Sequence, residues 1–143
     1  MKSLKYQLPA LILSFDDCNK IMKNVKQGLL NSSHISISIP FSALYGPKDE
    51  GGLQLNHLYL TQGLMHLKKN YRFFSTNTNI GKLLRTSVEA CVLEIGIGRN
   101  LFTLDYERYH CLASDFWIET LWHFAYKHGI TITDRITKFP LPK

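Results

Sequence analysis

Four segments of the chain repeat apolar residues at the spacing of an α-helix, and turn residues separate these segments. This period constrains the fold more than any other feature, because a repeat of 3.6 residues places apolar side chains on one face of a helix. It predicts a mainly α fold, a bundle of about four helices. The expected helices cover roughly residues 15–30, 56–74, 79–95 and 114–128.

The first helix is expected to begin after Ser14, a residue type that caps helix N-termini, with two carboxylates in its first turn, where the helix dipole favours negative charge. Its apolar stripe and its lysines fall on different faces, which predicts an amphipathic helix. The stripe is Phe15, Cys18, Met22, Val25 and Leu29, and the lysines are Lys20, Lys23 and Lys26.

The second and third helices each carry one predicted core stripe. In residues 56–74 the stripe is Leu60, Leu64, Leu67, Tyr71 and Phe74. In residues 79–95 it is Ile80, Leu84, Ser87, Val88, Cys91 and Ile95, and Gly96 is expected to end that helix. Both stripes predict helices that pack one face into a core.

The fourth helix has the clearest boundaries. Ser114 is the expected N-cap, and Gly129 followed by Ile130 is typical of a Schellman ending. Between these ends the helix is expected to run through Phe116, Trp117, Leu121, Phe124 and Ala125. Outside the helices, residues 34–40 alternate apolar and hydroxyl side chains and are expected to be a short strand or an extended connector. Residues 131–143 are expected to form an extended tail, and the whole of residues 1–143 a single domain.

Composition restricts where such a chain works. It has 143 residues, 45% of them hydrophobic, but no uncharged apolar run long enough to cross a membrane. Its three cysteines form no CxxC pair, so neither a disulfide framework nor a zinc site is indicated. We therefore expect a soluble, intracellular protein, nuclear or cytoplasmic, with no membrane partner.

The positive charge is concentrated in one half of the chain. The net charge is +6, yet residues 18–88 alone hold nine cations and two acids, a difference of +7. The nine are Lys20, Lys23, Lys26, Lys48, Lys68, Lys69, Arg72, Lys82 and Arg85. A field of this kind favours a polyanion partner, because neutralising phosphates releases counterions. A basic surface that is only solvated is the alternative.

No motif in the sequence assembles an active site. The six histidines form no HExxH pattern, and neither a P-loop nor a GxSxG elbow is present. Asp16 and Asp17 are adjacent, but both stand where the first turn of a helix favours acids. We expect no catalytic residue, no metal ligand and no cofactor.

Aromatic residues alternate with cations near the end of the second predicted helix. Tyr71, Arg72, Phe73 and Phe74 follow Lys68 and Lys69. This arrangement is compatible with a stacking surface beside phosphate contacts, as single-strand binding requires. The alternative places Tyr71 and Phe74 in the core stripe.

A series of short motifs resembles the segment that follows the palm in reverse transcriptases of non-LTR, LINE-like retroelements. It includes Tyr45-Gly46-Pro47, Gly51-Gly52-Leu53, Leu58-Tyr59, Gln62 and Lys82-Leu83-Leu84-Arg85, and it continues through Trp117, Trp122 and Gly129-Ile130. The resemblance covers about residues 7–135. Gln54 departs from the pattern, because the family usually has a glycine there.

The resemblance implies a thumb and connector whose basic helices grip the backbone of a template–primer duplex. The chain lacks the YxDD-type motif of the palm, whose aspartates bind the catalytic metals. We therefore expect a non-catalytic nucleic-acid-binding segment, not an enzyme, that works with a palm domain in trans or associates with itself. A helical structural or protein-interaction domain with no nucleic-acid role is the alternative. The candidate backbone contacts are Lys68, Lys69, Arg72, Lys82 and Arg85, with Lys20, Lys23 and Lys26 as a second group.

Overall fold

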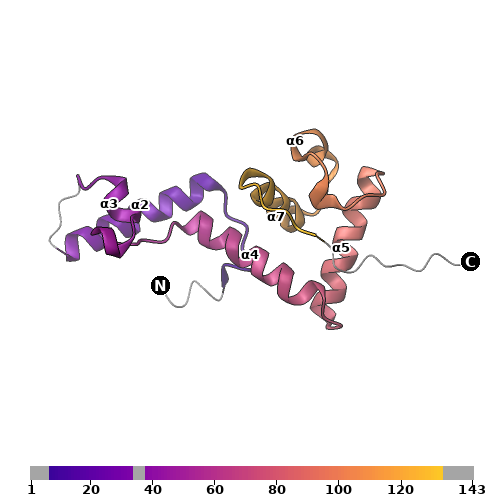
Figure 1. Cartoon of the computed structure of the whole chain (residues 1–143), viewed down its shortest axis with the longest axis horizontal. Helices are drawn as coiled ribbons and strands as arrows, with labels where there is room; N and C mark the ends of the chain where they lie inside the picture. Colours follow the sequence, from indigo (N-terminus) through magenta and orange to yellow (C-terminus); the bar gives the residue numbers. More distant parts are fainter. Residues whose placement is uncertain (1–6, 34–37, 134–143) are drawn as a thin grey trace, which may run out of the picture. The chain divides into compact units, whose positions relative to one another are not determined.

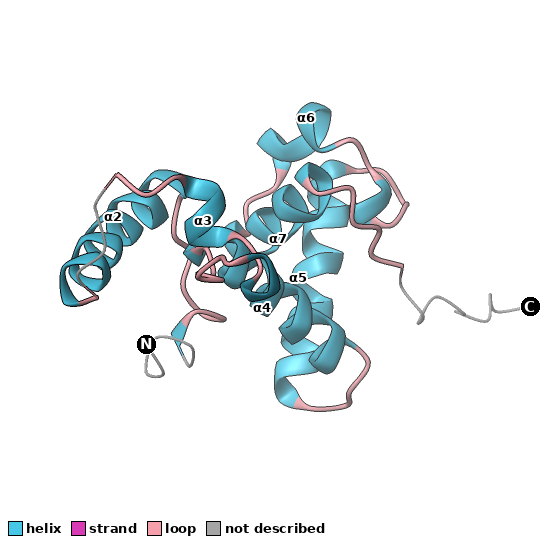
Figure 2. Cartoon of the chain, turned by 60° about the vertical axis from the view of Figure 1, so that its left-hand side comes forward, coloured by secondary structure: helices cyan, strands magenta, loops and turns pink. Residues whose placement is uncertain are grey.

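The computed structural model describes residues 7–33 and 38–133, and within these residues the fold is mainly α-helical without strands (Figure 2). The helices are α2 (Phe15–Ser32), α3 (Phe41–Tyr45), α4 (Leu58–Phe74), α5 (Asn79–Ile95), α6 (Tyr106–Tyr109) and α7 (Phe116–Lys127). Short 3-10 turns are η1 (Lys48–Glu50), η2 (Leu101–Thr103) and η3 (His110–Leu112).

The four predicted helices are confirmed as α2, α4, α5 and α7, each within about two residues at either end. Residues 34–37 and 134–143, which hold most of the predicted extended segment and of the tail, lie outside the described residues. Ser38 to Pro40 form no strand, and the helix α3 that follows them was not predicted.

The chain divides into two compact units, Met1–Leu64 (the first unit) and Met65–Lys143 (the second unit). The division falls inside α4, so the N-terminal half of this helix belongs to the first unit and its C-terminal half to the second. Each unit has buried apolar residues of its own. The single domain expected from chain length stays a prediction.

In the first unit, α2 packs beside α3 (Figure 1), and Lys26 of α2 lies over the Phe41 ring of α3 at 5.0 Å. Ser14 is the N-cap, as predicted, because its hydroxyl oxygen accepts a hydrogen bond from the backbone N–H of Asp17 at 3.1 Å. The same hydroxyl donates to the Asp17 carboxylate at 2.7 Å and lowers the pKa of that group. The buried apolar residues of this unit are Leu8, Cys18, Met22, Leu30, Leu44, Leu58 and Tyr59.

A tight turn between α3 and α4 depends on two glycines. Gly51 has a φ of 80°, in the left-handed region that glycine adopts without strain. A Cβ on Gly52 would lie 2.2 Å from the backbone oxygen of Gly46, so only glycine fits there. Gln54, at the position where the resembled family usually has glycine, also has a positive φ, of 49°.

The buried face of α4 differs from the predicted stripe. Leu60, Leu64 and Tyr71 are 44%, 59% and 77% exposed. The residues that are buried instead are Leu58, Tyr59, Gln62, His66 and Asn70, and Leu67 and Phe74 are only half-buried.

The physical reason is clearest at Gln62, which is 1% exposed. Its side-chain amide donates to the backbone oxygen of Leu13 at 3.2 Å and accepts from the Leu13 N–H at 3.3 Å. Because these bonds satisfy both groups of the amide, Gln62 is buried at little cost. The stripe prediction was therefore wrong for Leu60, Leu64 and Tyr71.

The second unit packs α5 and α7 around one apolar core (Figure 1). The buried members of this core are Leu84, Val88, Cys91, Ile95, Leu101, Phe102, Ile118, Leu121 and Trp122, and Phe73 and Phe74 pack against it. The predicted face of α5 is confirmed except for Ile80, which is 46% exposed because it lies in the first turn, beside the cap Thr78. The helix ends at Gly96, as predicted, with a φ of 74°.

At the N-terminal end of α7, the structure corrects the predicted cap. The N-cap is Asp115, whose carboxylate accepts from the N–H groups of Trp117 and Ile118, at 3.0 and 3.2 Å. Ser114 instead donates its hydroxyl to Glu94 at 2.6 Å, so it was wrongly expected to be the cap. Phe116, in the first turn of α7, is 73% exposed.

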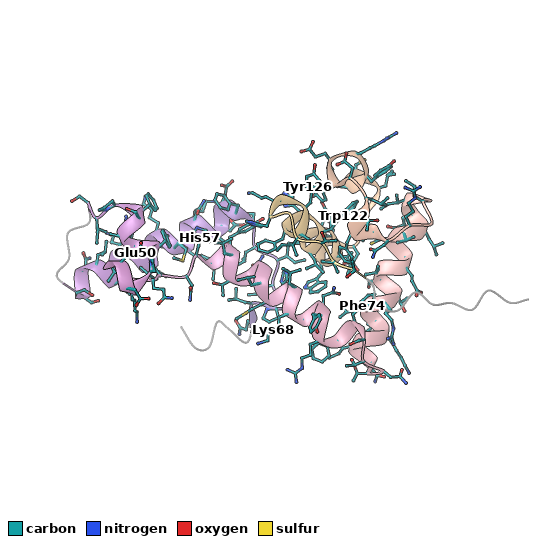
Figure 3. The ribbon with its side chains drawn as sticks, viewed as in Figure 1. Glu50, His57, Lys68, Phe74, Trp122 and Tyr126 are labelled. Carbon is teal, nitrogen blue, oxygen red and sulfur yellow. The ribbon has the colours of Figure 1, made fainter. Side chains whose placement is uncertain are left out.

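The C-terminal end of α7 has the predicted Schellman geometry. Gly129 has a φ of 62°, and the N–H of Ile130 bonds to the oxygen of Ala125 at 2.8 Å. Trp122 is 1% exposed and anchors α7 in the core (Figure 3). Tyr106 joins α6 to α7, because its ring contacts that of Trp122 edge-on at 5.2 Å and its hydroxyl donates to Glu119 at 3.0 Å.

Candidate nucleic-acid interface

Five of the eight candidate cations lie on two consecutive helices of the second unit. Lys68, Lys69 and Arg72 belong to α4, and Lys82 and Arg85 belong to α5. No Asp or Glu occurs between residues 51 and 88 to neutralise them. We call these five residues the α4–α5 basic surface.

The turn between the two helices brings their ends into contact. A Cβ on Gly81 would lie 2.3 Å from the backbone oxygen of Phe73 and 2.4 Å from that of Thr76, so α5 can begin this close to α4 only with glycine here. Thr78 caps α5 by accepting a hydrogen bond from the N–H of Gly81 at 3.2 Å. The cations of α5 are thereby held close to the end of α4.

Arg85 strengthens this contact directly. Its Nη1 donates a hydrogen bond to the backbone oxygen of Phe74 at 3.0 Å. Phe74 ends α4 (Figure 3), and the last carbonyls of a helix have no partner within the helix. Arg85 therefore has a structural role, and its remaining N–H donors stay available because the side chain is only half-buried.

Two further cations of this surface lie over aromatic rings. The Lys69 ammonium is 5.1 Å from the centre of the Trp117 ring, and the Arg72 guanidinium is 5.5 Å from that of Phe73. Such contacts contribute about 0.5–1 kcal/mol at exposed sites. They hold the charge near the protein surface without neutralising it.

Lys68 and Lys82 have exposed side chains without an ion pair in the part of the chain that the structure describes. Lys68 and Arg72 are four residues apart on α4, so they share one face of that helix. Figure 3 marks the position of Lys68 along α4. Lys68, Arg72 and Lys82 are the most exposed charges of the α4–α5 basic surface.

The second group of candidates lies on α2 of the first unit, apart from the α4–α5 basic surface in the chain. Lys20 approaches the Asp17 carboxylate at 3.8 Å, with both side chains exposed, and Lys26 lies over the Phe41 ring. Lys23 is exposed. An exposed pair such as that of Lys20 contributes little to stability, but it reduces the positive field around α2.

Tyr71 is the aromatic residue whose location departs most from expectation. The period of the sequence assigns it to the core, but its side chain is 77% exposed. Phe73, which the stripe leaves out, is half-buried against the core of the second unit. The sequence contains no signal that Tyr71 is exposed and Phe73 is half-buried. The polar residues of α4 decide which face of the helix is buried.

Two other kinds of feature were sought among the described residues, metal-ion clusters and membrane-spanning helices. Within residues 7–33 and 38–133, no three His, Cys, Asp or Glu side chains are grouped to hold a metal ion. No helix in these ranges combines the length and the apolar character needed to cross a membrane. Comparisons of the chain with models of protein families, with curated proteins and with solved structures found no match.

Proposed function

We propose that this chain is a non-catalytic segment that binds the phosphate backbone of nucleic acid through the α4–α5 basic surface. The observation that carries this proposal is the placement of five cations on two helix ends in contact, in a stretch of sequence without acids. Lys and Arg side chains that neutralise phosphates supply most of the affinity that does not depend on base sequence.

The resemblance to the thumb and connector of non-LTR reverse transcriptases agrees with this proposal, because those segments grip a template–primer duplex by its backbone. A palm domain supplied in trans would then perform the chemistry. Sequence-tolerant binding follows from contacts to phosphate oxygens, which position a protein without reading bases.

Salt dependence of binding tests the proposal. A fluorescently labelled RNA–DNA duplex is titrated with the chain at several salt concentrations. If all five cations contact phosphates, the logarithm of the affinity falls against the logarithm of salt with a slope of about −4.5. Absence of binding at low salt both to this duplex and to a single strand of the same length, or binding that salt leaves unchanged, excludes the proposal.

Lys82→Glu is the sharpest variant. It places an acid in the first turn of α5, where the helix dipole favours negative charge, so weaker binding cannot be attributed to loss of the helix. The slope is expected to change by about 1 in the direction of weaker salt dependence. Arg99→Glu is the matched control, because Arg99 is also exposed and in the second unit but lies outside the α4–α5 basic surface. Equal effects of the two variants would point to net charge alone.

Protein interaction is the second candidate function, and one observation favours it. Leu83 and Leu93 of α5 are 67% and 80% exposed, and Thr86 and Ala90 lie between them at the spacing of a helix-pairing stripe. Association with a second copy of the chain would cover this stripe. Light scattering after size-exclusion chromatography is expected to detect a dimer that Leu93→Lys dissociates, and a monomer at every concentration excludes self-association through this stripe.

A further inference from the structure

Tyr71 lies on the exposed side of α4 between two exposed cations. Lys68 precedes it by three residues, which places the two side chains one above the other on the helix surface. Arg72 follows it directly, and both cations are exposed. An aromatic ring that is 77% exposed thus stands within the α4–α5 basic surface.

Of the aromatic residues near the end of α4, only Tyr71 is offered to a partner. Phe73 and Phe74 are half-buried and pack against the core of the second unit. The Arg72 guanidinium lies over the Phe73 ring, 5.5 Å from its centre, and this contact keeps its charge close to the helix. Phe73 and Phe74 therefore fix this end of α4 against the core, while Tyr71 stays exposed to solvent.

The exposure of Tyr71 adds little to folding. A large aromatic side chain stabilises a fold mainly through the apolar area it buries, and Tyr71 buries less than a quarter of its surface. The neighbouring cations make an apolar protein surface a poor partner, because covering Tyr71 would also remove Lys68 and Arg72 from water. A partner that provides both a flat ring and a negative charge meets all three side chains.

Unpaired nucleotides have both properties. Proteins that bind single strands combine cations along the backbone with aromatic side chains on which bases stack. The bases of a duplex are already stacked inside the helix, where a side chain on a helix surface does not reach their faces. A ring at the position of Tyr71 can therefore stack on a base of a single strand but not on a base of a duplex.

We propose that Tyr71 is a stacking platform for an unpaired base, so that the α4–α5 basic surface binds single-stranded RNA or DNA in preference to duplex. This inference rests on the proposed function, because the phosphates next to the stacked base contact Lys68 and Arg72. It replaces the duplex implied by the family resemblance with a single-stranded segment.

The experiment compares short labelled oligothymidylate with a duplex of the same length, by fluorescence anisotropy at one low salt concentration. Stacking of one base contributes about 1–3 kcal/mol by alanine substitution, which is roughly 5-fold to 150-fold in affinity. Tyr71→Ala is expected to weaken oligothymidylate binding at least fivefold and to leave duplex binding unchanged. Tyr71→Phe retains the ring and is expected to bind as the unmodified chain does.

Phe116→Ala is the matched control, because Phe116 is 73% exposed on α7 of the same unit. An oligonucleotide with abasic sites removes the base and keeps the phosphates, so Tyr71→Ala should no longer reduce affinity for it. Circular dichroism verifies that each variant retains its helices, as expected for a substitution at an exposed position.

The outcomes separate the two proposals. If neither nucleic acid binds, the proposed function fails, and the stacking site fails with it. If both bind with steep salt dependence but Tyr71→Ala weakens neither, or weakens both equally, backbone binding stands and the stacking site is excluded. An effect of Phe116→Ala as large as that of Tyr71→Ala also excludes it.

Discussion

Substitutions of two residues of α4, Gln62 and Leu64, test which face of the helix is buried. Gln62 is polar and 1% exposed, whereas Leu64 is apolar and 59% exposed. Reasoning from hydrophobic pattern alone expects Leu64→Ala to be the damaging substitution, and Gln62→Leu to be neutral or stabilising. The structure predicts the opposite order.

The magnitudes follow from what each side chain contacts. Gln62→Leu leaves both the N–H and the oxygen of Leu13 without their partner, at about 1–3 kcal/mol for each unsatisfied group. Because both bonds are longer than 3 Å and only partly buried, the lower end applies, and the loss is about 2 kcal/mol in total. Leu64 buries about two-fifths of its surface, so truncating it removes roughly 1 kcal/mol or less.

Urea denaturation followed by far-ultraviolet circular dichroism measures both free energies of unfolding. The two residues belong to the same unit, so their variants are compared on the same transition. A buried leucine would lose about 2–5 kcal/mol on truncation to alanine. If Leu64→Ala costs that much, or more than Gln62→Leu does, the described orientation of α4 is wrong.

Substitutions at three other places in the fold have defined outcomes. Gly81→Ala is expected to destabilise the second unit by at least about 1–3 kcal/mol, since the added Cβ overlaps backbone oxygens, and an unchanged unfolding midpoint would contradict the contact between helix ends. Asp115→Ala should cost about 1 kcal/mol of unfolding free energy in the same denaturation assay, as loss of an N-cap does. Ser114→Ala should cost less, because the partner of Ser114 is an exposed carboxylate. The reverse order would show that Ser114 is the cap. Burial lowers the pKa of His57 below its ordinary 6.5, and its Nδ1 accepts a hydrogen bond from the Tyr59 N–H, so the unfolded chain takes up a proton first as pH falls. Its contribution to stability is complete above about pH 6.5 and declines as pH falls below that value; His57→Gln should flatten the pH profile of the unfolding free energy, and an unchanged profile refutes the assignment.

The sequence predicts helix positions well because the signals for helix ends are local. Ser14, Gly96 and Gly129 act through hydrogen bonds and backbone angles within a few residues, and each has the predicted role. The competition between Ser114 and Asp115 for the cap of α7 is less local, because it depends on Glu94 of another helix. Sequence alone does not place Glu94 beside Ser114.

The buried face of α4 was mispredicted for the same physical reason. Hydrophobic period assumes that apolar residues alone decide which face turns inward. Here a backbone segment more than forty residues earlier in the chain, at Leu13, supplies both hydrogen bonds that allow Gln62 to be buried. A pairing between distant residues of this kind leaves no mark in the local pattern.

The orientation of α4 also determines what its outer face can bind. If Leu64 and Tyr71 had been buried as the pattern predicts, Lys68 would lie at the edge of the core and no aromatic ring would stand beside it. Burying Gln62 and Asn70 instead leaves Lys68, Tyr71 and Arg72 exposed on the same helix. Positions that violate hydrophobic patterning are expected at functional sites, where the loss in packing is offset elsewhere. The double variant Gln62→Leu/Leu64→Gln exchanges the two side chains and adds no charge. It should therefore weaken folding of the first unit, because the hydrogen bonds to Leu13 are lost, while leaving the affinity of the folded chain for single strands unchanged, because neither residue belongs to the α4–α5 basic surface.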